Sequence, residues 1–197
     1  EPIEAQIYAD SDGITCLNDD VSMTAYTNYP FASIVWTTIE GGELEQINNN
    51  VAVANDQGVY MITVISEDGN CSSEDVYEVL LDTLSYEATT GPSSTLNCYS
   101  STYILQGGSN YDDAEFSWAT QDGQFLGSSF DQNPTVVSEG EYTLTVTNPS
   151  NGCVTEATVE IDEDFNEPII SLGYPSGIIS CETPTVQIEG TSVLPDG

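Results

Sequence analysis

Apolar and polar residues alternate with a period of two in short segments along the whole chain. Val21, Met23 and Ala25 take every second position of one segment, and the stretch 142–146 (YTLTV) does the same. Successive side chains of a strand point to opposite faces, so this alternation predicts strands that are buried on one face. Clusters of Gly, Pro, Asn and Ser bound these segments, and no period of 3.6 extends over a helical length. We therefore expect an all-β fold.

The pattern repeats along the chain with a step of 82 or 83 positions, which predicts a tandem array. The landmarks that keep this register are Cys16, Cys98 and Cys181, then Cys71 and Cys153, Trp36 and Trp118, and Tyr60 and Tyr142. We predict two full repeats, residues 1–82 and 83–166, and the first part of a third repeat, residues 167–197. The third repeat stops before its Trp, Tyr and second Cys, so we expect the chain to be a piece of a longer array.

Two kinds of turn are expected in each repeat. Residues 66–71 (SEDGNC) and 148–153 (NPSNGC) are interpreted as hairpins that join the last two strands of their repeats. Residues 39–42 (IEGG) and 121–124 (QDGQ) are interpreted as hairpins that follow the strand with the Trp. The Trp and Tyr landmarks are expected in the core.

The order Cys, Trp, Cys in each repeat resembles that of immunoglobulin-like sandwiches. The Gly-x-Tyr sequences that end at Tyr60 and Tyr142 resemble the tyrosine corner of that fold. One departure is that the second Cys follows the hairpin, which is closer to the polycystic-kidney-disease-type (PKD-like) and related bacterial repeats. We therefore expect tandem Ig-like β-sandwiches.

The resemblance implies one disulfide in each repeat, Cys16–Cys71 and Cys98–Cys153, near one end of the sandwich. Each bond would close a loop of about 55 residues, worth roughly 4 kcal/mol in the chain-entropy model. Four buried free thiols are the alternative. Cys181 is left unpaired, with its partner expected beyond the chain. Disulfides imply an oxidising compartment, and hence secretion to the cell surface.

The stretch GEYTLTVTNPSNGC, with its upstream Trp strand, resembles the tandem repeats of giant bacterial surface proteins exported by type IX secretion. Gliding-motility adhesins and predatory grappling-hook filaments belong to this set. The sequence Asp82-Thr83-Leu84 also resembles the O-glycosylation signal of such bacteria, which makes Thr83 a candidate for modification.

The chain has 33 acidic residues and no Lys, Arg or His, which excludes several functions. Phosphate and anionic lipid are bound through Lys and Arg, so we expect no nucleic-acid partner and no attraction to membranes. Catalytic systems that need His are impossible, and no apolar run is long enough to span a membrane. We do not expect an enzyme.

Carboxylates make calcium the one cofactor to consider, because hard cations take oxygen ligands. The candidates lie near the start of the chain and at the repeat junctions: Asp10, Asp12, Asp82, Asp162 and Asp164. A solvated acidic linker is the alternative at each position. The net charge of −33 is typical of a surface adapted to salt water.

Aromatic residues gather before each Trp strand, as Tyr26, Tyr29 and Phe31 in the first repeat and Tyr111 in the second. Such loops bind sugars or protein partners, or pack against a neighbouring repeat or a parallel copy in a filament.

Our leading hypothesis is a structural shaft of a long extracellular adhesin or cell-surface filament that serves attachment or gliding. The alternative is a carbohydrate- or protein-binding Ig-like module, and a third option is an accessory domain of a secreted hydrolase.

Overall fold

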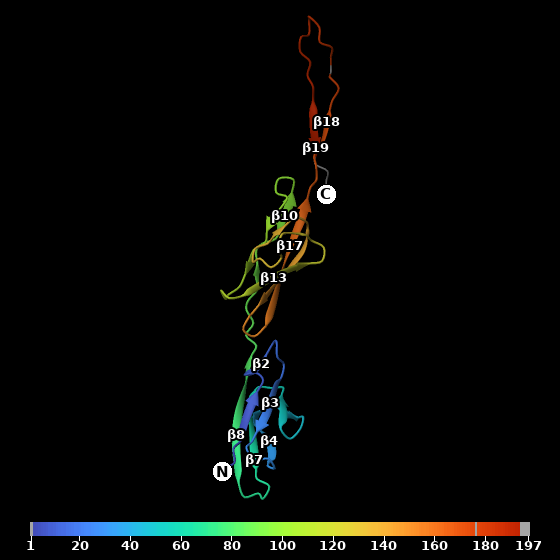
Figure 1. The fold of residues 1–197 in the computed structure, drawn as a ribbon. Coiled ribbons are helices and arrows are strands. Elements are labelled where there is room, and N and C mark those ends of the chain that lie inside the picture. The colour runs from blue at the N-terminus through green and yellow to red at the C-terminus, as the bar shows by residue number, and fades with distance from the viewer. Residues whose placement is uncertain (1, 176, 194–197) are drawn as a thin grey trace. The chain divides into compact units, whose positions relative to one another are not determined.

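A computed structural model describes residues 2–175 and 177–193 of the chain, and every regular element within them is a β-strand (Figure 1). Residues 1, 176 and 194–197 belong to the predicted first and third repeats and lie outside the described residues. The expected all-β fold is confirmed.

The first repeat forms two four-stranded sheets with the strand order of an immunoglobulin-like sandwich. Its strands are β1 (Gln6–Ala9), β2 (Gly13–Thr15), β3 (Val21–Tyr26), β4 (Ser33–Gly41), β5 (Leu44–Gln46), β6 (Val51–Ala54), β7 (Gly58–Ile65) and β8 (Ser72–Asp82). One sheet has the order β1-β3-β6-β5 and the other β2-β8-β7-β4. These correspond to the ABED and CFG sheets of the immunoglobulin fold, with β2 added beside the last strand. The Ig-like assignment therefore rests on the topology of the chain itself.

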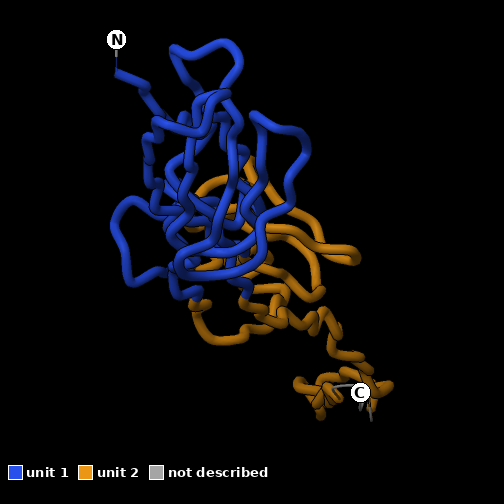
Figure 2. Tube along the Cα trace, turned by 90° about the horizontal axis from the view of Figure 1, so that it is seen from below, with its two compact units in different colours: residues 1–88, 108–116, 145–156 blue, residues 89–107, 117–144, 157–197 orange. Residues whose placement is uncertain are grey.

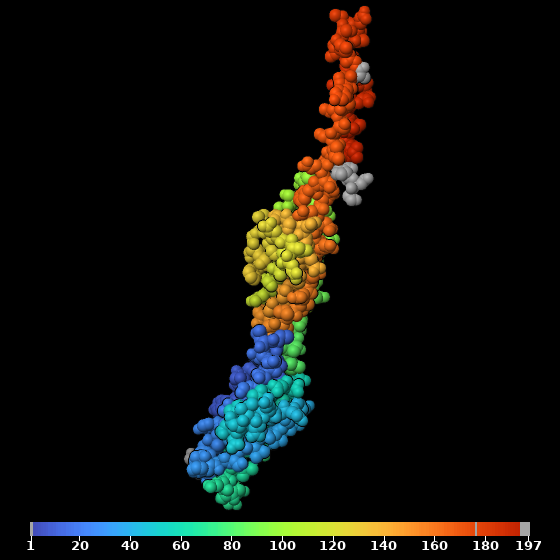
Figure 3. Space-filling model, turned by 90° about the vertical axis from the view of Figure 1, so that its right-hand side faces the viewer, coloured from blue at the N-terminus to red at the C-terminus, as the bar shows by residue number. Residues whose placement is uncertain are grey.

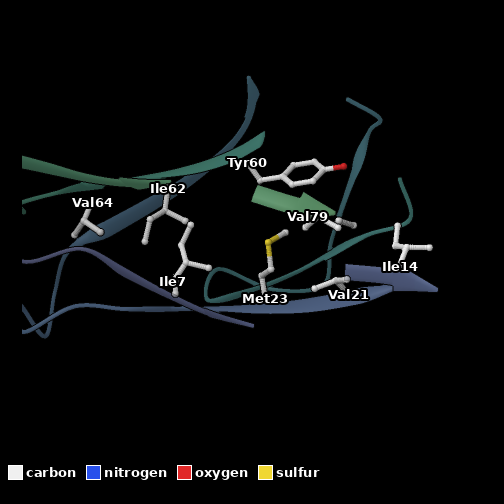
Figure 4. Packing of buried hydrophobic residues seen from close by; sticks show 10 residues of the cluster. Ile7, Ile14, Val21, Met23, Tyr60, Ile62, Val64 and Val79 are labelled. Atoms are coloured by element: carbon white, nitrogen blue, oxygen red, sulfur yellow. The ribbon is translucent and has the colours of Figure 1, made fainter. Parts of the chain in front are cut away.

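The core of this sandwich consists of the alternating residues of β3 and β7. Val21, Met23, Tyr60, Ile62 and Val64 are completely buried. Figure 4 shows the residues of β7 in one row, facing Met23 and Val21 from the other sheet. Burial of each such side chain contributes about 1.5–3 kcal/mol.

The tyrosine hydroxyls make the contact that defines a tyrosine corner. The Tyr60 hydroxyl donates to the carbonyl of Asp56 at 2.8 Å, and the Tyr142 hydroxyl donates to the carbonyl of Ser138 at 2.9 Å. Burial raises the pKa of Tyr60, and the Asp56 carboxylate raises it further. Each hydroxyl fixes the chain where it enters the buried strand.

The predicted turns differ in their outcome. Residues 66–71 form a hairpin, because β7 and β8 pair antiparallel with Ile65 opposite Ser72. The prediction for residues 39–42 is wrong, since β4 pairs with β7 while β5 pairs with β6 in the other sheet. This turn crosses between the sheets, and Gly41 has a φ of 112°, which favours glycine.

The second repeat ends in two long strands, as the first does, and several of its other strands are only two residues long. Its strands are β9 (Thr89–Thr90), β10 (Ser94–Asn97), β11 (Tyr103–Ile104), β12 (Gly107–Gly108), β13 (Glu115–Thr120), β14 (Phe125–Leu126), β15 (Thr135–Val136), β16 (Gly140–Thr147) and β17 (Val154–Asp164). The larger sheet has the order β10-β17-β16-β13, and smaller ones join β11-β15-β14 and β12-β9.

The two Trp landmarks differ in their polar contacts. The Trp118 indole is almost completely buried and donates to the carbonyl of Gln132 at 3.2 Å. Trp36 is partly buried against the core of the first repeat, and its buried indole nitrogen has no hydrogen-bond partner among the described residues. A buried donor without a partner costs about 1–3 kcal/mol.

Contacts divide the chain into two compact units that do not follow the predicted repeat boundaries (Figure 2). Unit 1 comprises residues 1–88, 108–116 and 145–156, so it includes two loops of the second repeat. Unit 2 comprises residues 89–107, 117–144 and 157–197. The repeat boundaries at residues 82 and 166 stay a prediction.

The part of the third repeat that is described contains one antiparallel pair, β18 (Ile169–Leu172) and β19 (Gly190–Val193). Figure 3 shows this orange-to-red segment as a narrow column of atoms, and every residue of β18 and β19 is exposed. Ile188, which the alternation predicts to be buried, is also exposed. An alternating segment is buried only where a second sheet covers its apolar face.

Candidate functional site: a disulfide-linked junction

The disulfide of the structure joins Cys16 in the first repeat to Cys153 in the second repeat. Their Cα atoms lie 5.0 Å apart and 137 positions separate them in sequence. Cys16 follows β2, whose last residue, Thr15, pairs with Asp82 at the end of β8. Cys153 ends the hairpin before β17 and is completely buried. We call this bond the junction disulfide, and both of its cysteines belong to unit 1.

The predicted pairs Cys16–Cys71 and Cys98–Cys153 are therefore wrong, and the reason is geometric. Cys71 precedes the first residue of β8, whereas Cys16 lies beside its last residue. At about 3.3 Å per residue the 11-residue strand separates them by roughly 35 Å, and a disulfide needs Cα atoms within about 7 Å. In the second repeat, β17 separates Cys98 from Cys153 in the same way.

We call Cys16 and Cys98, which follow β2 and β10, the strand-end cysteines, together with Cys181 at the equivalent position of the sequence repeat; Cys71 and Cys153 are the hairpin cysteines. The structure joins a strand-end cysteine of one repeat to a hairpin cysteine of the next. Cys71, Cys98 and Cys181 are exposed free thiols. The expectation of a disulfide inside each repeat is replaced by one bond between repeats.

Two buried asparagines of the hairpin bind the segment that connects the repeats. The Asn151 amide donates to the Asp82 carboxylate at 2.8 Å and to the Leu84 carbonyl at 3.0 Å. The Asn148 amide donates to the same carbonyl at 2.9 Å. The Asn151 side-chain oxygen accepts from the backbone N–H of Cys153, so the residue also fixes the cysteine. These contacts hold the hairpin and the connecting segment in one arrangement.

Gly152 brings the hairpin into close contact with the first repeat. Its φ is 72°, in the left-handed region, and a Cβ there would lie 2.2 Å from Cγ of Leu17. Gly69, in the matching hairpin of the first repeat, has the same φ and no atom within 4 Å of such a Cβ. The backbone conformation is shared, but only Gly152 is required by packing.

A third set of contacts lies where the aromatic loop of the second repeat meets the connecting segment. The Tyr111 ring stacks on that of Tyr86, with centroids 4.2 Å apart. The Tyr86 hydroxyl donates to the Asp113 carboxylate at 3.2 Å, and the Asn110 side chain accepts from the Glu87 backbone N–H at 2.8 Å. Burial and the Asp113 hydrogen bond raise the pKa of Tyr86. One part of the predicted aromatic surface is therefore used in packing.

The remaining aromatic residues of the predicted loop are exposed to solvent. Tyr26, Tyr29 and Phe31 have large exposed fractions in the first repeat. Thr83, the candidate for O-glycosylation, is exposed on the connecting segment. These positions are accessible to a ligand or a modifying enzyme.

The calcium candidates do not form a cluster in the structure. The carboxylates of Asp10, Asp82 and Asp164 accept hydrogen bonds from Ser22, Asn151 and Asn166, respectively. Asp12 and Asp162 are exposed. Within residues 2–175 and 177–193, no three His, Cys, Asp or Glu side chains are placed to hold a metal ion. Calcium binding stays a prediction.

Two open acidic depressions occupy the same position in the two sequence repeats. Glu40 and Glu78 line one beside β7, and Asp122 and Glu160, 82 positions later, line the other beside β16. These carboxylates do not converge on a common point for a ligand.

The sequence did not single out Asn148, Asn151 or Tyr86, although they make the junction. The sequence signal that could have indicated the junction is the pair of Asn residues in the NPSNGC hairpin. The matching SEDGNC hairpin of the first repeat has Ser and Gly at these two positions. Sequence reasoning assigned these residues to a turn, where Asn is common for local reasons.

Comparisons with known proteins assign no family to the chain. No family model matches the chain, and no curated protein matches it. Similar solved structures include a mutated three-Ig fragment of titin, domains I67–I69, with 11% identity and a TM-score of 0.40, covering 95% of this chain and 77% of that one. Murine CEACAM1b has 14% identity and a TM-score of 0.38 over 82% of this chain and 100% of that one.

The fibronectin(III)-like modules of Clostridium thermocellum CbhA have 14% identity and a TM-score of 0.39, covering 80% of this chain and 95% of theirs. Such values carry no argument about function. Among the described residues no helix is long and apolar enough to cross a membrane. The topology and the disulfide thus establish an Ig-like module of the kind found in oxidising compartments.

Proposed function

We propose that the chain is a load-bearing segment of an extracellular shaft, built from Ig-like repeats at residues 1–82, 83–166 and 167–197. The observation that carries this proposal is the junction disulfide. It joins Cys16 to Cys153, so a pull along the chain passes through the bond and bypasses residues 17–152. A covalent bypass around most of two repeats serves a protein that must resist stretching.

The asparagine contacts support the same role, because they bind the hairpin of residues 148–153 to the connecting segment beside the disulfide. The acidic surface keeps such shafts apart and soluble, since 33 carboxylates without any Lys or Arg repel one another. Disulfides persist in secreted proteins, which supports a location of the shaft outside the cell. Attachment or gliding by a type IX-secreted adhesin or filament is the biological setting that we propose.

Single-molecule force spectroscopy tests this function. Pulled from its ends without reductant, the chain should release only the roughly 60 residues outside the bond, about 210 Å at about 3.5 Å each. With reductant, all 197 residues should extend, to about 690 Å. The Cys71→Ser/Cys98→Ser variant is the matched control and should behave like the unreduced parent. Full extension of the unreduced chain would refute the load-bearing role.

The binding-module alternative is favoured by the exposed ring faces of Tyr26, Tyr29 and Phe31. Aromatic side chains of this kind stack on sugars and fill pockets of protein partners. Calorimetric titration with soluble polysaccharides tests it, with Tyr26→Ala/Phe31→Ala as the control. Saturable binding that this variant loses would assign the first repeat a ligand.

A further inference from the structure

The surface that receives the hairpin in the first repeat recurs in the second repeat. There it is formed by Cys98, Tyr99 and Asp164, which stand 82 positions after Cys16, Leu17 and Asp82. The backbone is the same in both places. Asn97 pairs in parallel with Asp164, as Thr15 does with Asp82.

The loop that follows the short strand is also the same. The Asn97 N–H donates to the Ser100 carbonyl at 2.9 Å, and the Thr15 N–H donates to the Asn18 carbonyl at 2.8 Å. The strand-end cysteine is the first residue of this loop in both repeats. The second repeat therefore presents its cysteine on a backbone matching the one that carries a disulfide in the first.

This second surface is uncovered among the described residues. Cys98 is an exposed free thiol, and the Tyr99 ring is completely exposed. Leu17, the equivalent of Tyr99, lies against Gly152 of the hairpin that it receives. Cys16 and Leu17 also stay exposed in the formed junction, so the free thiol of Cys98, and not the exposure of this surface, marks it as open.

The complementary half is the hairpin of the first repeat. Its loop is closed by a hydrogen bond from the Ser66 N–H to the Cys71 carbonyl at 2.9 Å, as Asn148 N–H bonds the Cys153 carbonyl at 2.9 Å. Cys71 is exposed, whereas Cys153 is completely buried in its junction. Ser66 replaces the first amide donor in this hairpin, so its polar contacts differ in detail from those of residues 148–153.

We propose that Cys98 and Cys71 are the two open halves of further junction disulfides, each made with the complementary cysteine of another repeat of this design. Cys98 takes the hairpin cysteine of a repeat that follows, and Cys71 takes the strand-end cysteine of a repeat that precedes. Cys181, the third strand-end cysteine, has the same role one repeat later. This proposal rests on the shaft function.

The bond-forming step needs an oxidant of the disulfide class. The two thiols give up two protons and two electrons by thiol–disulfide exchange, and the oxidising disulfide leaves as two thiols. The first protein thiolate attacks the oxidising disulfide and forms a mixed disulfide with it. The second protein thiolate then attacks this mixed disulfide and completes the bond. An exposed thiol such as Cys98 is accessible to this exchange.

The consequence is two continuous covalent paths along the array, here called threads, each of which alternates between disulfides and short stretches of backbone. One thread passes through the bond Cys16–Cys153 and then follows the backbone to Cys181, where the next bond starts. The other thread passes through Cys98 in the same manner. Because successive bonds overlap in sequence, unfolding of one repeat lengthens the shaft only by the short backbone segments between bonds, such as residues 154–180.

The test is disulfide mapping of the full natural protein, alkylated without reduction and digested at acidic residues, since residues 1–197 contain no trypsin site. The Cys16–Cys153 peptide pair is the internal control. We expect the Cys98 peptide joined to a hairpin-type peptide of another repeat, and the Cys71 peptide joined to a strand-end type. The proposal is overturned if Cys71 and Cys98 are alkylated or carry a small-thiol adduct. It is also overturned if two strand-end or two hairpin cysteines are joined to each other, or if the bonds lie within one repeat.

Variants of the full protein give a second readout. Cys98→Ser should leave one new free thiol, on the hairpin cysteine of the following repeat, which thiol alkylation of the folded protein would detect. If no thiol appears, Cys98 has no partner and the proposal fails. A shaft that resists stretching but has free Cys98 would leave the proposed function intact and refute only this inference.

Discussion

Removal of the junction disulfide should destabilise both repeats at once. The perturbation is Cys16→Ser, Cys153→Ser or the double variant, each of which opens the same bond. A disulfide inside each repeat would predict a different result, in which Cys16→Ser affects only the first repeat and Cys153→Ser only the second. Whether one repeat or both lose stability therefore distinguishes a disulfide inside each repeat from a disulfide between repeats.

The magnitude follows from the loop that each repeat closes when it unfolds alone. The hairpin contacts hold Leu84 close to Cys153. An unfolded first repeat is then tethered at Cys16 and Leu84, a loop of about 70 residues. An unfolded second repeat is tethered through Cys153 to Cys16, which lies beside Asp82 at the end of β8 in the folded first repeat, and this loop is again about 70 residues. In the chain-entropy model each tether is worth about 4 kcal/mol.

The two Trp residues allow each repeat to be followed separately. Trp36 reports on the first repeat, and Trp118 on the second, so Trp→Phe variants at one position leave a single fluorescent probe. Urea or thermal unfolding of each single-Trp protein should show a loss of 2–4 kcal/mol, or about 10 °C or more in Tm, for both probes. Cys71→Ser and Cys98→Ser are matched controls and should change neither transition.

The reasoning would be refuted by a shift in only one probe. It would also be refuted if Cys71→Ser destabilised the first repeat as much as Cys16→Ser does, because Cys71 has no partner in this chain.

Two further predictions concern the hairpins. Gly152→Ala should lower the free energy of unfolding by about 1 kcal/mol more than Gly69→Ala, because both substitutions strain a φ of 72° but only the first places a Cβ against Leu17. Urea unfolding measures both losses, and Leu17→Ala should remove the difference between them. Equal losses would contradict the contact between Gly152 and Leu17. The Asp68 carboxylate accepts hydrogen bonds from Ser66 and Asn70, which lower its pKa from 3.8 to about 2. The folded state therefore gains stability from this group above about pH 4 and loses it as the pH falls toward 2. Carboxyl 13C NMR titration should show this pKa, and Ser66→Ala should raise it; a pKa near 3.8 in the parent would count against the hydrogen bonds.

The predictions that came from alternation hold because they depend on local geometry. Val21, Met23, Tyr142 and Leu144 are all completely buried, as the period of two predicts. A strand places alternate side chains on opposite faces wherever it lies, so the pattern specifies the buried face without knowledge of the partner sheet. The failure at Ile188 shows the limit, since burial also requires a covering sheet.

The predictions that needed a distance across the fold failed. The cysteines were paired by their equal spacing, yet β8 places Cys16 and Cys71 at opposite ends of an 11-residue strand. The turn at residues 39–42 was interpreted as a hairpin, because a sequence does not show which of two sheets the next strand joins. The calcium candidates are a different case: the Asp82 and Asp164 carboxylates accept hydrogen bonds from nearby amides, and calcium binding stays a prediction.

The sequence by itself determined the strand class, the step of the repeat, the position of the tyrosine corners and the buried face of those strands that a second sheet covers. Each of these follows from residues within one strand or from a periodic comparison. Only the tertiary structure decided that the disulfide joins two repeats, because strand length and direction convert nearness in sequence into separation in space. The fold likewise brings Cys153 beside Cys16 although 137 positions separate them in sequence, and their disulfide cross-links the two repeats.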